Sequence, residues 1–123
     1  MTYQFICYPN CSTCKKARKW LDDQGISYAY RDIKEDRPNV DELSQWIPLS
    51  KLPIRKFFNT SGQSYRSLSV KDHLDDLSTG QIIELLADDG MLVKRPLLVG
   101  NDFVLVGFKE EVWIEEIKKN RLL

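Results

Sequence analysis

The sequence predicts an α/β fold in which a β-α-β unit and a β-β-α unit flank a block of helices. Two observations predict it. Short aromatic and branched apolar runs occur near both ends of the chain, and helical spacing of apolar residues dominates the stretch between them. No linker-like segment borders the helical stretch, so we expect residues 1–123 to form a single domain with a helical insertion at about 36–90.

The N-terminal unit comprises a strand, a helix and a second strand. Residues 3–8 alternate in polarity and are rich in aromatics, and a Pro-Asn pair ends the run. The helix that follows has apolar residues at the i, i+3, i+7 spacing of a buried stripe, and Gly25 suits its C-terminal end. The stripe consists of Cys14, Ala17 and Leu21. Residues 26–33 alternate again, and a strand there would run parallel to the first through a right-handed crossover.

The insertion is predicted to contain several short helices. Asn39 or Asp41 can cap the first helix, and we expect Pro48 to end it. Further helical segments are expected at 54–58, 70–77 and 78–87, with Gly90 closing the last of them.

The C-terminal unit is predicted to be a hairpin followed by a helix. Strands are expected at 97–99 and 103–106, joined by the turn 100–102, in which glycine and asparagine suit a positive φ. Gly107 would end the second strand, and 110–123 has the apolar spacing of a terminal helix.

The composition is that of an ordinary globular protein, with 42% apolar and 29% charged residues. Eighteen basic residues balance 18 acidic ones, which argues against binding nucleic acid through bulk charge. No apolar run is long enough to span a membrane, and the N-terminus lacks the pattern of a signal peptide. With 3 cysteines, an odd number, we expect a cytoplasmic location, and we expect a monomer without a membrane or nucleic-acid partner.

The candidate catalytic motif is Cys11-Ser12-Thr13-Cys14, at the start of the first predicted helix. A helix N-terminus carries partial positive charge, which favours the thiolate form of a cysteine placed there. A thiolate attacks disulfides, and a second cysteine two residues away can then close on the first. Basic residues follow the motif directly, and Lys15 is near enough in sequence to help hold a thiolate. The motif predicts a redox-active pair.

Several alternatives remain open from the residues alone. The two cysteines could be inert core residues, or they could bind zinc together with Cys7 and His73. Cys7 lies on a predicted strand face and is more typical of a core residue, and His73 is surrounded by charged residues. The basic residues after Cys14 could form only a solvated helix face.

The order of elements and four separated motifs resemble the glutaredoxin-like arsenate reductase (ArsC) and Spx family of the thioredoxin-like superfamily. The motifs are Cys11–Ala17, Lys56–Gly62 with Tyr65-Arg66 after it, Lys94–Leu97 and Val106–Glu111. The resemblance implies a thioredoxin-like fold with a mixed four-stranded sheet and a helical insertion between its second and third strands. It also implies a cis Arg95-Pro96 bond facing the active-site cysteine.

The resemblance places the family's nucleophile at Cys11 and its oxyanion-binding arginine at Arg95. The arsenate reductases use two further arginines, where this chain has Asn59 and either Phe108 or Lys109. Guanidinium groups hold a tetrahedral oxyanion in a bidentate manner that lysine and asparagine do not reproduce. Arsenate is therefore the less favoured substrate.

We expect a thiol-disulfide oxidoreductase in which Cys11 attacks and Cys14 resolves. Arg95, Pro96, Asn59 and Thr60 are expected to bind the anionic part of the substrate, although the segment 59–62 could be only a turn. No bound cofactor is expected, and an external reductant such as glutathione with glutaredoxin, or thioredoxin, would restore the dithiol. The resemblance also implies an alternative, an Spx-like regulator that binds the α subunit of RNA polymerase and uses the same cysteines as a redox sensor.

Overall fold

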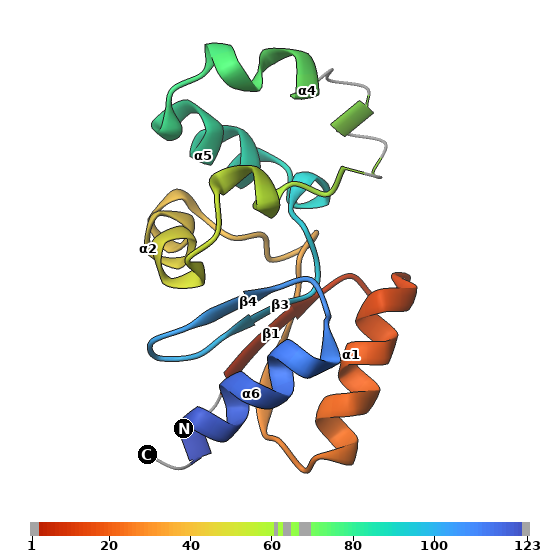
Figure 1. Cartoon of the computed structure of the whole chain (residues 1–123). Coiled ribbons are helices and arrows are strands. Elements are labelled where there is room, and N and C mark those ends of the chain that lie inside the picture. Colours follow the sequence, from red (N-terminus) through yellow and green to blue (C-terminus); the bar gives the residue numbers. More distant parts are fainter. Residues whose placement is uncertain (1–2, 61, 63–64, 67–69, 122–123) are drawn as a thin grey trace.

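The computed structural model describes residues 3–60, 62, 65–66 and 70–121. A mixed four-stranded sheet lies at the centre, in the order β2-β1-β3-β4 (Figure 1). The strands are β1 (Tyr3–Cys7), β2 (Tyr28–Asp32), β3 (Leu97–Val99) and β4 (Val104–Val106). β1 pairs parallel with β2 and antiparallel with β3, and β3 pairs antiparallel with β4. This arrangement confirms the predicted β-α-β and β-β-α units.

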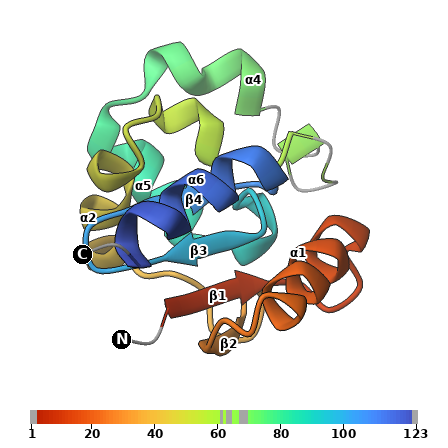
Figure 2. The same ribbon diagram turned by 60° about the horizontal axis from the view of Figure 1, so that its bottom comes forward.

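Helices cover both faces of the sheet. The α-helices are α1 (Ser12–Asp23), α2 (Val40–Ser50), α4 (Val70–His73), α5 (Thr79–Asp88) and α6 (Glu110–Arg121), and the 3-10 helices are η1 (Ile54–Phe57), η2 (Leu74–Asp76) and η3 (Gly90–Leu92). α1 and α6 lie on one face, and the insertion between β2 and β3, with α2 and α5, lies on the other (Figures 1 and 2). Among the described residues, no helix is both long and apolar enough to cross a membrane.

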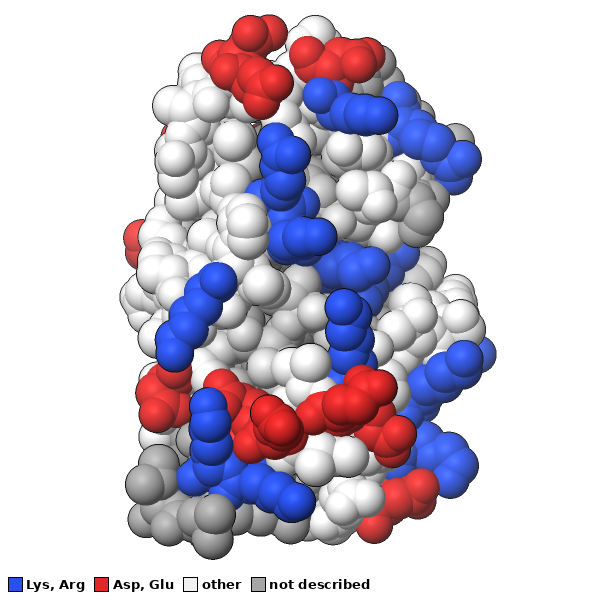
Figure 3. Space-filling model, viewed as in Figure 1, with Lys and Arg blue, Asp and Glu red and all other residues white. Residues whose placement is uncertain are grey.

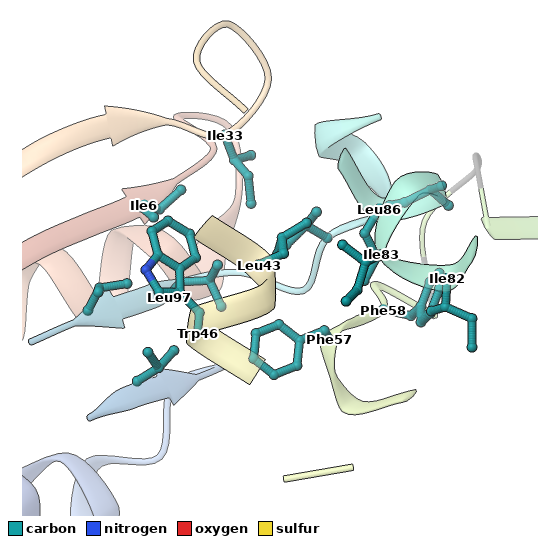
Figure 4. Packing of buried hydrophobic residues seen from close by; sticks show 14 of the residues in the cluster. Ile6, Ile33, Leu43, Trp46, Phe57, Phe58, Ile82, Ile83, Leu86 and Leu97 are labelled. Carbon is teal, nitrogen blue, oxygen red and sulfur yellow. The ribbon is translucent and has the colours of Figure 1, made fainter. Parts of the chain in front are cut away.

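The sheet separates two apolar cores because successive side chains of a strand point to opposite faces. Ile6 and Leu97 face the insertion, where they pack with Trp46 in a large cluster that extends to α5 (Figure 4). Phe5 and Leu98, one residue away along each strand, belong to the second core with α1 and α6. β1 and β3 therefore pack against helices on both faces of the sheet.

Arg31 of β2 connects the sheet to the insertion. Its two terminal nitrogens donate to the Glu42 carboxylate of α2 at 2.6 and 2.7 Å, and one of them also donates to the Gln4 side chain at 3.3 Å. The remaining donors reach the carbonyl oxygens of Asp36 and Arg37 at 2.8 and 3.1 Å. The guanidinium lowers the pKa of the Glu42 carboxyl below its ordinary value. This bidentate pair fixes α2 against β2.

The expectation that Pro48 ends the first helix of the insertion was wrong. α2 contains Pro48 and continues to Ser50, and it stops at Lys51, whose φ of 60° is left-handed. Proline removes one backbone hydrogen bond to the preceding turn, a loss that the packed apolar face of Leu43 and Trp46 outweighs. Asn39 forms the predicted cap, and its side chain accepts from the Glu42 N–H.

Two glycines have roles that the sequence did not indicate. Gly100 was expected to supply a positive φ, but in the described part of the chain only Lys51, Gly25 and Gly107 adopt one. A Cβ at Gly100 would instead overlap the Phe103 ring. A Cβ at Gly90 would overlap the Ile33 carbonyl oxygen, so the chain after α5 passes close to the end of β2.

Glu42→Gln is expected to lower the free energy of unfolding near pH 7 by about 1–3 kcal/mol, because Arg31 loses its charged partner. A carboxyl with a lowered folded pKa adds stability above its unfolded pKa, and that stability is lost as the pH falls through the folded value. The difference between wild type and variant should therefore shrink below about pH 4, as measured by urea unfolding across pH. The matched control is Glu35→Gln, at an exposed carboxyl, which should change little. A difference that is absent at pH 7 would contradict this account.

Candidate functional site

Cys11 is the N-cap residue of α1 and is partly exposed. Its N–H donates to the Tyr8 carbonyl oxygen at 3.0 Å, and its own carbonyl oxygen accepts from the Lys15 N–H at 3.1 Å. The first turn of α1 contains no acidic residue, so nothing there offsets the partial positive charge of the helix N-terminus. Cys11 is therefore open to solvent at the N-terminus of a helix.

Cys14, in the first turn of the same helix, is buried, with 1% of its surface exposed. The Tyr8 N–H donates to the Cys14 sulfur at 3.4 Å. A hydrogen bond with the Cys7 thiol and burial raise the pKa of the Cys14 thiol, and the Tyr8 N–H acts in the opposite direction. Cys14 is therefore a protonated thiol at neutral pH. The motif contains one accessible sulfur and one protected sulfur.

Cys7, which the sequence offered as a core residue or a zinc ligand, is a neighbour of this pair. It is buried at the end of β1, as predicted, and its thiol lies within hydrogen-bonding reach of both the Tyr8 carbonyl oxygen, at 3.5 Å, and the Cys14 sulfur. The alternation of β1 and the buried stripe of α1 are the two sequence patterns that bear on the contact between Cys7 and Cys14. Both patterns turn their cysteine toward the same core, but neither pattern alone shows the contact.

The described residues offer no support for the zinc alternative. Among them, no group of three or more His, Cys, Asp or Glu side chains is arranged to hold a metal ion. His73 is exposed at the end of α4, within the insertion.

Arg95 and Pro96 lie beside the cysteine turn. The peptide bond between them is cis, as the family resemblance implies. The Arg95 guanidinium lies 5.3 Å from the centroid of the Tyr8 ring and donates to the Met91 carbonyl oxygen at 3.4 Å. The Pro96 carbonyl oxygen accepts from the Gly107 N–H at 2.8 Å. Tyr8 contacts both Arg95 and Cys14, which brings a cation into the surroundings of the two cysteines.

Asn59 and Thr60 have different surroundings despite being adjacent. Asn59 is 8% exposed, and its N–H donates to the Leu92 carbonyl oxygen at 2.7 Å. Its side chain packs against Gly62, where a Cβ would come close to the Asn59 amide nitrogen. Thr60 is exposed and lines a hollow. Asn59 therefore shapes the loop, and Thr60 is the one of the two that is open to a ligand.

The hollow that Thr60 lines has a volume of about 580 Å³ and reaches α1 at Thr13, two residues after Cys11. Its basic residues come from the insertion, from the segment before β3 and from the start of α6. They are Arg55, Lys56, Lys94 and Lys109. Among its described lining residues there is no acid. Blue side chains gather along the middle of the face in Figure 3, with acidic side chains above and below them. The hollow could not be predicted from the sequence, because its basic residues are far apart in the chain.

Comparison with known proteins places this site in a family context. The uncharacterized protein YusI of Bacillus subtilis is 45% identical over 115 residues, which cover 94% of this chain and 98% of that protein. An ArsC family related protein from Bacteroides fragilis has a crystal structure with a TM-score of 0.91 and 52% identity, covering 94% of this chain and 97% of that one. A possible arsenate reductase from Streptococcus mutans has a TM-score of 0.85 and 44% identity, covering 92% and 98%.

More distant relatives are regulators. The global transcriptional regulator Spx of Staphylococcus aureus is 27% identical over 103 residues, which cover 84% of this chain and 77% of the regulator. The ArsC family itself matches residues 6–116. With a thioredoxin-like fold and structural neighbours that include a possible arsenate reductase, this chain belongs to the ArsC family.

Proposed function

We propose that this protein is a cytoplasmic thiol-disulfide oxidoreductase, with Cys11 as the nucleophile and Cys14 as the resolving thiol. The observation that carries the proposal is the contrast between the two sulfurs: Cys11 is partly exposed at the N-terminus of α1, and Cys14 is buried one turn further along. A dithiol enzyme needs this contrast, because the attacking sulfur has to meet the substrate and the resolving sulfur must not react first.

In the first step the Cys11 thiolate attacks one sulfur of a substrate disulfide. The substrate S–S bond breaks, a new bond joins Cys11 to the substrate, and the departing substrate sulfur leaves as a thiolate that takes up a proton. Arg95, half-buried beside Tyr8, supplies positive charge near the turn. That charge favours an anionic group on the substrate.

In the second step Cys14 attacks the Cys11 sulfur of the mixed disulfide, the bond between Cys11 and the substrate sulfur breaks, and the Cys14 proton passes to the departing substrate thiolate. The Tyr8 N–H already donates to the Cys14 sulfur and stabilises the thiolate as it forms. The products are a Cys11–Cys14 disulfide and the second substrate thiol. An external thiol reductant, glutathione with glutaredoxin or thioredoxin, supplies the two electrons that restore the dithiol.

Arsenate is a poorer substrate in this proposal. The hollow near Thr13 presents mainly lysines, with Arg55 as its one arginine among the described lining residues. Asn59, where the arsenate reductases have an arginine, is buried in its loop. Lysine is a point charge, whereas bidentate recognition of a tetrahedral oxyanion depends on guanidinium groups.

A regulatory role is the second candidate, and the similarity to Spx favours it. In that case the Cys11–Cys14 disulfide would change a surface that binds the α subunit of RNA polymerase, and no substrate would turn over. The same pair of thiols serves either role, so the two candidates differ in their partner and not in their cysteine chemistry.

Cys14→Ser is expected to trap a mixed disulfide between Cys11 and a model disulfide substrate, because the resolving thiol is gone. Cys11→Ser should form no such adduct and should lose turnover by at least about 100-fold, the loss typical of removing a nucleophile. Intact-mass spectrometry after incubation with the substrate, followed by reduction, measures both. Cys7→Ser is the matched control, and it should neither trap an adduct nor abolish turnover. Undiminished turnover by Cys11→Ser would refute the proposed nucleophile.

A turnover panel separates the candidate functions. With glutaredoxin or thioredoxin reducing systems, the protein should reduce a model disulfide at least about tenfold faster than arsenate, because its hollow presents one arginine, Arg55, among the described lining residues. Faster reduction of arsenate would reverse the assignment of substrate. Absence of turnover, together with oxidant-dependent retention on immobilised RNA polymerase α subunit, would establish the regulator instead.

A further inference from the structure

The hollow beside α1 concentrates positive charge on a chain whose formal net charge is +0. Arg55 forms an ion pair with Asp75 at 4.0 Å, and both side chains are largely exposed. Lys56, Lys94 and Lys109 form no ion pair with any described acidic residue. A groove of one sign of charge attracts ligands of the opposite sign and raises their association rate.

The positive surface continues beyond this hollow. A second hollow, of about 640 Å³, shares Arg55, Lys56 and Thr60 with the first. It adds Lys71 of α4 and one acid, Asp75, the ion-pair partner of Arg55. We call the two together the basic groove. It extends from Thr13, two residues after Cys11, across the insertion. Either hollow is far larger than a single small oxyanion needs, and the two together suit an extended chain.

The basic groove also has exposed apolar walls. Leu52, after α2, and Val112, in α6, line the first hollow from different elements, and 40% and 49% of their surfaces are exposed. Phe58 and Phe108 line it as well. A small hydrated anion gains nothing from such walls, whereas a peptide can bury an apolar side chain between them.

We propose that the basic groove is a docking site for an extended, acidic segment of a protein partner, which seats an apolar side chain between Leu52 and Val112. The inference deepens the proposed function and rests on it: the docked segment presents its own disulfide to Cys11. The preferred substrate is then a protein disulfide with acidic neighbours, and not a small neutral disulfide.

The binding test does not depend on cysteine chemistry. A short fluorescein-labelled peptide with glutamates, one leucine and a serine in place of cysteine is titrated with wild-type protein, and fluorescence anisotropy is measured. Affinity should be at least about tenfold higher than for the same peptide with glutamines, and the difference should fall as salt is raised. Equal affinity for the two peptides would overturn the proposal. If the two peptides bind with equal affinity and millimolar inorganic phosphate displaces the acidic one, the basic groove is a small-anion site instead.

Variants locate the binding. Lys56→Glu combined with Lys109→Glu should remove the preference for the acidic peptide, and Leu52→Ser should weaken binding of both peptides severalfold. Lys34→Glu is the matched control, since Lys34 is exposed in the turn after β2 and lines neither hollow. Circular dichroism verifies folding, and Lys56→Gln combined with Lys109→Gln repeats the test without charge reversal. A preference that survives in both double variants would refute the basic groove as the docking site.

Exchange kinetics distinguish a failure of this inference from a failure of the proposed function. The same two peptides are prepared as disulfides of cysteine with a neutral thiol. If the acidic peptide exchanges with Cys11 at least about tenfold faster than the glutamine peptide, both proposals are supported. Equal exchange rates retain the oxidoreductase and refute the docking preference. If neither peptide exchanges, the proposed function fails, and the anisotropy measurement still decides whether the basic groove binds an acidic segment.

Discussion

The hydrogen bonds that join Cys11 and Cys14 to the backbone directly after Cys7, at the end of β1, are the interactions on which the site depends. Tyr8, the next residue, donates its N–H to the Cys14 sulfur and accepts the Cys11 N–H at its carbonyl oxygen. These two hydrogen bonds from one residue set the start of α1. Burying one sulfur therefore fixes the other at the helix N-terminus, where it remains accessible, and the asymmetry of the pair follows from the packing of the core.

The insertion is part of the site because Arg31 and the larger core hold it against the sheet. Arg31 uses its donors on α2, on β1 and on the turn that precedes α2. At the other end of the insertion, the Lys94 N–H donates to the Phe57 carbonyl oxygen at 2.7 Å. This hydrogen bond joins the segment before β3 to η1. Without these contacts, Lys56 and Thr60 would have no defined position relative to α1. The basic groove is thus a product of tertiary structure.

Local patterns predicted the fold well because each strand and helix has its own periodicity. The alternation in β1, the stripe of α1 and the hairpin near Gly100 were all correct in type, and the Cys11–Cys14 motif was visible directly. Pro48 misled the prediction because tertiary packing outweighed a local signal. The burial of Asn59 and the contact between Cys7 and Cys14 depend on residues distant in the sequence. The lysines of the basic groove come from three separate segments, which no local pattern relates.

We propose that Cys11 and Cys14 form the redox pair and that Cys7, although adjacent, stays outside it. Peptide mapping of the wild-type protein after treatment with one equivalent of a disulfide oxidant, with all remaining thiols alkylated, tests this most directly. We expect a Cys11–Cys14 disulfide and an alkylated Cys7. A Cys7–Cys14 disulfide with Cys11 alkylated, or three alkylated thiols, would contradict it.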